Sequence, residues 1–158
     1  MRKITTAFVF ILIVGMIALL LIPYVYNNYC LYKFSKQLSM FPFPDEILIV
    51  EKRSVLGKLN GNGNGMEYCA CVLVKSTLDT GQINEVFMSY TFSPARSKGS
   101  AGVEANVLTV DGPQLNTDYV EHENITFQSL LDADTYDDYY VIFIYDGGYS
   151  TIVDIRGH

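Results

Sequence analysis

An uncharged, apolar stretch at the N-terminus constrains this chain more than any other feature of its sequence. No charged residue occurs between Lys3 and Lys33, and every residue from 7 to 22 is apolar or glycine. A helix needs about 20 mostly apolar residues to cross the hydrocarbon core of a bilayer. We therefore expect a transmembrane helix at residues 4–26, inside an N-terminal membrane anchor of residues 1–30.

The alternative for this stretch is a cleaved signal peptide, because Arg2 and Lys3 form a short positive segment before the apolar run. The residues that follow Leu21 are mostly too bulky for a cleavage site, which favours an uncleaved signal-anchor. The basic N-terminus favours a cytoplasmic position, although Lys33 and Lys36 beyond the apolar run oppose it. We expect a single-pass protein of the cell membrane, with its N-terminus cytoplasmic and its C-terminal domain outside.

Residues 31–158 are enough for one compact domain. Their pattern predicts an α+β fold with a mostly antiparallel sheet of about five strands and one main amphipathic helix. The expected strands cover residues 47–50, 66–75, 103–110, 139–145 and 149–155. The last two would form a hairpin, because Asp146-Gly147-Gly148 is a typical turn sequence. Strand 66–75 is apolar on both faces near its middle, which places it inside the sheet.

Two helices are expected in this domain. A short one continues from the membrane, because Leu31, Phe34 and Leu38 recur at helical spacing. The main helix begins after Asp79, which can form a capping box with Gln82. Its buried face is predicted to contain Ile83, Val86, Phe87 and Tyr90.

Charge is distributed unevenly along the domain. Residues 99–158 carry a net charge of −10, whereas residues 31–98 carry +2. The negative half excludes nucleic-acid binding there, because phosphate contacts need Lys and Arg. It suits a protein partner with a basic surface, whose approach the charge would steer.

The candidate partner-binding residues lie in a Tyr- and Asp-rich cluster. Aspartates can hold calcium. The spacing does not match an EF-hand loop, which leaves a calcium site of another kind, and the alternative is a solvated loop without a site. Tyrosine suits interfaces because its large ring and hydroxyl lose little entropy on binding. The candidates are Asp132, Asp134, Tyr136, Asp137, Asp138 and Tyr139.

A second candidate site is the Asn- and Gly-rich stretch of residues 57–65. Its backbone N–H groups could form an anion-binding nest, to which Lys58 would add positive charge. Leu59 follows that lysine, so the stretch is not a P-loop. The alternative is a flexible connection between two strands. The candidate ligand-binding residues are Lys58, Asn60, Asn62 and Asn64.

Catalytic side chains are few, and we expect no cofactor and no metal. The chain holds two histidines, and only His122 lies well inside the domain. Cys69 and Cys71 would point to the same side of a strand. We expect them to be small residues of the core. We therefore expect a membrane-anchored domain that binds a partner without catalysis. The alternative is a membrane-anchored ligand sensor or enzyme that holds an anionic small molecule at the Lys58 loop.

Overall fold

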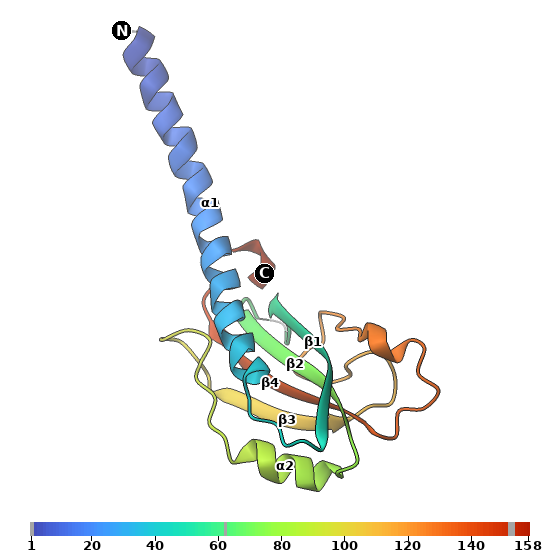
Figure 1. Cartoon of the computed structure of the whole chain (residues 1–158). Coiled ribbons are helices and arrows are strands. Elements are labelled where there is room, and N and C mark those ends of the chain that lie inside the picture. The colour runs from blue at the N-terminus through green and yellow to red at the C-terminus, as the bar shows by residue number, and fades with distance from the viewer. Residues whose placement is uncertain (1, 62, 152–153) are drawn as a thin grey trace.

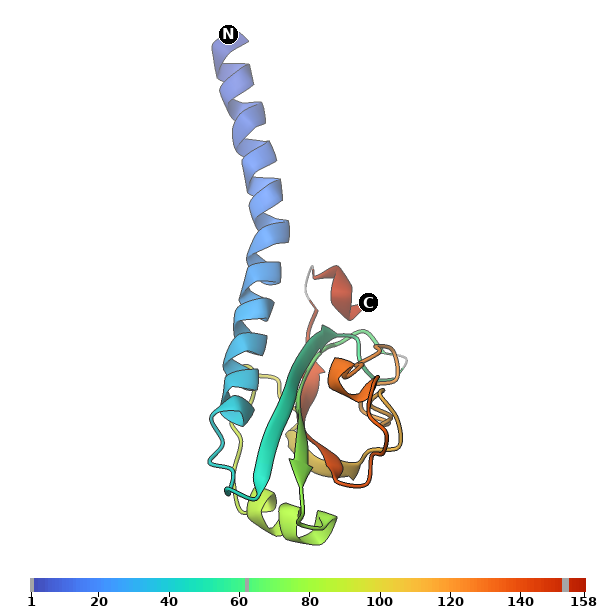
Figure 2. The same cartoon turned by 45° about the vertical axis from the view of Figure 1, so that its right-hand side comes forward.

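The computed structural model describes residues 2–61, 63–151 and 154–158, with side chains from residue 9 onward. A long helix, α1 (Arg2–Ser39), projects from a layered α+β domain (Figures 1 and 2). Its N-terminal part stands clear of the domain, and its C-terminal part packs on one face of the sheet. The predicted fold class is therefore confirmed in outline.

The free part of α1 is long and apolar enough to cross a membrane. The whole helix is about 57 Å long at 1.5 Å per residue. Nearly all side chains of residues 9–22 are exposed, and the most apolar stretch is not buried against the rest of the chain. A helix in the core of a soluble domain would bury such side chains, whereas here they have no apolar cover from the described part of the chain.

The last turns of α1 belong to the domain core. Cys30, Phe34 and Leu38 are buried against the sheet. The short helix expected after the apolar stretch is thus present, as an unbroken continuation of the apolar helix. It ends at Ser39, shortly before Pro42.

The sheet has four antiparallel strands in the order β1-β2-β4-β3. They are β1 (Ile47–Gly57), β2 (Met66–Ser76), β3 (Val103–Thr109) and β4 (Tyr139–Tyr149). The two central strands are buried on both faces, as expected for residues 66–75. α1 and α2 (Thr80–Met88) contribute to the core on one face. Residues 111–138, with the short helix η1 (Gln128–Leu130), cover the other face.

The predicted C-terminal hairpin, and with it the fifth strand, is wrong. β4 runs through Asp146-Gly147-Gly148 to Tyr149, while Tyr68 pairs with Asp146 and Met66 pairs with Tyr149. β4 therefore carries one extra residue, a β-bulge, and Gly148 supplies a φ of +88° there. The glycines bend a strand instead of reversing it. Of the predicted strand 149–155, residues 152–153 lie outside the described residues, and a short 3-10 turn, η2 (Ile155–Gly157), follows.

Helix α2 begins as predicted. The Asp79 carboxylate accepts a hydrogen bond from the Gln82 N–H at 2.9 Å, and the Gln82 side chain accepts one from the Asp79 N–H at 3.0 Å. Ile83 and Phe87 are buried. The helix ends at Met88, so Tyr90 lies beyond it.

Candidate functional site

Residues 111–138 form an ordered layer on the face of the sheet opposite α1, which we call the acidic layer. Although it is almost without regular structure, its backbone is tied together: the Leu115 N–H donates to the Ile125 carbonyl and the Phe127 N–H to the Pro113 carbonyl. Its apolar side chains pack against β2 and β4. The buried ones are Leu115, Val120, Ile125, Phe127 and Leu130.

The carboxylates of the acidic layer all point outward. The layer holds eight of them and no Lys or Arg, and all eight residues are exposed. The ion pairs found among the described residues join Arg53 to Glu51 and Arg156 to Asp154, so they involve none of the eight. These uncompensated carboxylates belong to Asp111, Asp118, Glu121, Glu123, Asp132, Asp134, Asp137 and Asp138.

The predicted partner-binding residues divide into two groups. The four aspartates from 132 to 138 are exposed, and the only side-chain contact found for them in the described structure joins Asp137 to Thr135 at 3.3 Å. Tyr136 and Tyr139 are half-buried against the core below the layer. The ammonium group of Lys75 also lies 5.1 Å from the Tyr139 ring centroid. The aspartates are therefore more available to a partner than the tyrosine rings.

The other end of the acidic layer contains no predicted partner-binding residue. Asp111, Asp118, Glu121 and Glu123 lie around an open depression of about 670 Å³. The signal that could have found them is the run of 57 residues from 99 to 155 without a single Lys or Arg, in which these carboxylates also lie.

The Asn- and Gly-rich loop is bound to its surroundings through its backbone. One carboxylate oxygen of Glu67 accepts from the N–H groups of Leu59 and Asn60, at 2.6 and 2.7 Å. The Leu59 carbonyl in turn accepts from the backbone N–H groups of Glu121 and His122. The protein's own carboxylate thus occupies two donors that an anionic ligand would need.

The candidate ligand-binding residues of this loop differ in how far they are exposed. Lys58 is half-buried, and its N–H donates to the Arg156 carbonyl at 2.7 Å. Asn64 is exposed, and Asn60 is half-buried. Asn62 lies outside the described residues. A ring nitrogen of His122 lies 2.7 Å from the Gly61 carbonyl oxygen.

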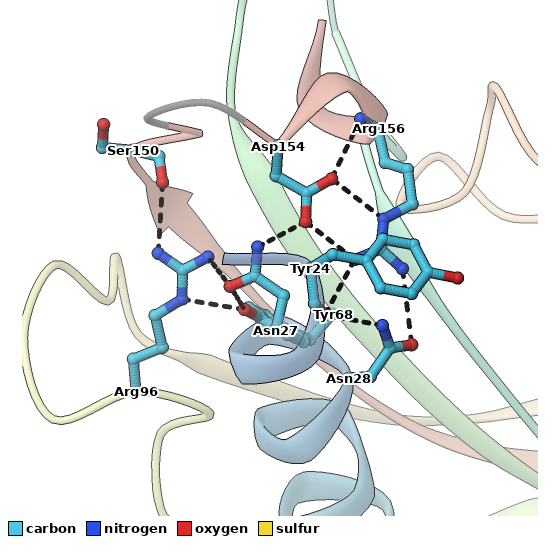
Figure 3. A network of polar contacts seen from close by, with 8 residues as sticks. All are labelled: Tyr24, Asn27, Asn28, Tyr68, Arg96, Ser150, Asp154 and Arg156. Carbon is cyan, nitrogen blue, oxygen red and sulfur yellow. Dashed lines mark hydrogen bonds and ion pairs between the residues drawn. The ribbon is translucent and has the colours of Figure 1, made fainter. Parts of the chain in front are cut away.

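A polar junction joins α1 to the domain next to the apolar part of the helix (Figure 3). Asn27 is buried at its centre. Its side-chain oxygen accepts from Arg96 at 2.7 Å and from the Tyr68 hydroxyl at 3.2 Å, and its amide nitrogen donates to Asp154 at 2.6 Å. One side chain of α1 therefore binds three segments that are far apart in the sequence.

Two arginines complete this junction. Arg156 pairs with Asp154 at 2.7 Å, lies 4.0 Å from the Tyr24 ring centroid and donates to the Asn28 side chain at 3.3 Å. The Arg96 guanidinium donates to the Tyr68 hydroxyl at 2.8 Å and packs over aromatic rings of the domain. The C-terminal turn and the loop after α2 are thereby both fixed to the end of the domain from which the free part of α1 projects.

This junction depends on the charge of Asp154. The hydrogen bond from Arg156, supported by one from Asn27, lowers the pKa of the Asp154 carboxyl from 3.8 to about 2. The stabilisation that the ionised Asp154 carboxylate gives to the fold is therefore fully present above about pH 4. It is lost as the pH falls through 2.

We expect Asp154→Asn to reduce the free energy of unfolding at pH 6, by an amount of the order of 2 kcal/mol. The difference from the wild-type protein should shrink steadily between pH 4 and pH 2. Urea unfolding followed at several pH values measures it. A difference that stays constant down to pH 2 would show that the Asp154 charge does not stabilise the junction.

The described residues include possible metal ligands and three cysteine thiols. Within them, no group of three or more His, Cys, Asp or Glu residues is arranged to hold a metal ion. Cys30, Cys69 and Cys71 are free and buried. Burial raises the pKa of the Cys71 thiol to about 12, so its reactive thiolate is scarce at neutral pH.

Comparisons of the chain with models of protein families, with curated proteins and with solved structures find no match.

Proposed function

We propose that this protein is a single-pass membrane protein whose acidic layer binds a protein partner with a basic surface, without catalysis. The observation that carries the proposal is the set of eight exposed carboxylates on residues 111–138, none in an ion pair among the described residues. They stand on a layer packed against the central strands. A fixed array of like charge attracts a complementary partner with less ordering cost than a disordered tail.

In this proposal, α1 is not cleaved from the domain, and it crosses the cell membrane. Asn27, which follows the apolar stretch, is buried in the domain, and the Tyr24 carbonyl accepts from Arg156 at 3.3 Å. Cleavage of a signal peptide near these residues would remove contacts that the fold uses. The positive charge at the N-terminus supports an orientation in which the N-terminus lies in the cytoplasm and the domain lies outside.

The alternative is an anion site at the Lys58 loop, and it has less support from the structure. Glu67 already accepts from the N–H groups of Leu59 and Asn60 and brings a negative charge to the loop. We therefore propose the acidic layer as the binding surface.

Binding of a lysine-rich peptide to the full-length protein in lipid nanodiscs tests this proposal. Replacing Asp132, Asp134, Asp137 and Asp138 by Asn should weaken binding about fourfold or more at low salt, because each exposed charge pair contributes about 0.2–1 kcal/mol. The variant's affinity should also depend less on salt concentration.

A matched control removes the same amount of charge elsewhere. Four of the exposed carboxylates outside the acidic layer can be neutralised as Asp45→Asn, Glu46→Gln, Glu85→Gln and Glu104→Gln. This control should keep most of the peptide affinity. Equal losses in the two variants would mean that only net charge matters and that the acidic layer is no specific surface.

A further inference from the structure

The most exposed large hydrophobic side chain among the described residues lies at the membrane end of the domain. Ile155, the first residue of η2, is 81% exposed. It is flanked by Asp154, which is buried, and by Arg156, which is held by several contacts. The exposure of Ile155 is therefore set by an ordered turn that directs this one side chain outward.

The position of this turn relative to α1 is fixed by short contacts. The Arg156 guanidinium lies 4.0 Å from the centroid of the Tyr24 ring and donates to the Tyr24 carbonyl at 3.3 Å. Asp154 accepts from Asn27 at 2.6 Å. Figure 3 shows these residues in one network, and in Figure 2 the red C-terminal turn extends from the sheet toward the free part of α1. η2 therefore lies beside residues 24–28 of the helix.

Those helix residues mark the end of the apolar stretch. Tyr24 lies only two residues, or about 3 Å of helix rise, before the end of the expected span at residue 26. Tyrosine is enriched at this depth because its ring is apolar and its hydroxyl is polar. A turn held beside Tyr24 stands at the boundary between lipid headgroups and acyl chains.

We propose that η2 is a second membrane contact, in which Ile155 inserts into the lipid interface next to α1. The cost of bringing charge to this depth is reduced, because Arg156 is paired with Asp154 at 2.7 Å. An apolar side chain moved from water into the interface is stabilised by the hydrophobic effect. Together with α1, this contact fixes the rotation of the domain about the helix axis, and so the direction in which the acidic layer faces.

This inference rests on the proposed crossing of the membrane by α1, and the experiment separates the two. The chain contains no tryptophan, so a single introduced tryptophan reports its own environment. We would reconstitute full-length Ile155→Trp into phosphatidylcholine vesicles whose acyl chains carry bromine, a contact quencher of tryptophan fluorescence. Ile13→Trp, in the apolar stretch, and Met88→Trp, on α2 at the far end of the domain, are the matched controls; both positions are exposed.

We expect strong quenching in Ile13→Trp, clear quenching in Ile155→Trp and almost none in Met88→Trp. The last control also shows that an exposed tryptophan does not by itself pull the domain into lipid. If Ile13→Trp is quenched and Ile155→Trp resembles Met88→Trp, the second membrane contact is refuted while the anchor stands. If Ile13→Trp is not quenched, the anchor and the inference fail together.

Discussion

A fragment that begins at residue 40 will not fold, whereas a fragment that begins at residue 24 will form a stable domain. The difference lies in the last turns of α1, where Phe34 and Leu38 are almost completely buried in the core. Burial of one such side chain contributes about 1.5–3 kcal/mol. Since a whole domain is stable by only about 5–15 kcal/mol, the loss of the entire helix face removes most of that margin.

Circular dichroism and thermal unfolding of the two fragments measure this difference. Within fragment 24–158, Phe34→Ala should lower the free energy of unfolding by about 3–5 kcal/mol. Tyr32→Ala is the matched control, because Tyr32 is 60% exposed on the same helix, and it should cost less than about 0.5 kcal/mol. Cooperative unfolding of fragment 40–158 would contradict the placement of α1 in the core.

Asp146→Ala will be among the most destabilising single substitutions in the sheet. Asp146 is fully buried in β4, and its carboxylate accepts from the Ala95 N–H at 2.7 Å, from the Ser100 hydroxyl at 2.5 Å and from the Tyr149 hydroxyl. The alanine variant leaves these three donors without their acceptor. Because hydrogen bonds to charged groups are worth about 1.5–3 kcal/mol each, we expect a net loss of about 3 kcal/mol or more.

Urea unfolding of Asp146→Ala and Asp146→Asn tests this role. The asparagine variant keeps the shape and one acceptor oxygen, so it should recover part of the lost stability. The loop that contains Ala95 and Ser100 should also exchange its amide hydrogens faster in the alanine variant. A loss below about 1 kcal/mol would mean that Asp146 does not hold this loop to β4.

Local patterns in the sequence predicted the elements whose structure is determined locally. The apolar stretch before Lys33 predicted the long helix, and the Asp79 and Gln82 pair predicted the start of α2. The two apolar faces of β2 predicted a central strand. In each case neighbouring residues carry the information, through periodicity or a capping contact.

The C-terminal glycines were misread because two structures need the same backbone conformation. A tight hairpin turn and a β-bulge both place glycine at positive φ, as at Gly148. What decides between them is the pairing of Tyr149 with Met66, a contact between residues more than 80 positions apart. A local pattern contains no information about that pairing.

Distant contacts also explain what the sequence did not reveal about the candidate site. The buried side chains of the acidic layer, such as Leu115 and Val120, follow neither helix nor strand periodicity, so the segment resembled a solvated loop. The junction depends on Asn27, Arg96 and Asp154, which the fold brings together from distant parts of the chain. The exposed aspartates of residues 132–138, by contrast, were identifiable from composition alone.

Crosslinked capture of the full-length protein from its own membranes tests the central claim most directly. The tagged protein would be compared with the variant carrying Asn at positions 132, 134, 137 and 138, and with the control that neutralises Asp45, Glu46, Glu85 and Glu104. We predict a discrete partner with a basic surface that is captured by the wild-type protein and the control and lost from the acidic-layer variant. A partner retained equally by all three proteins would contradict the acidic layer as its binding surface.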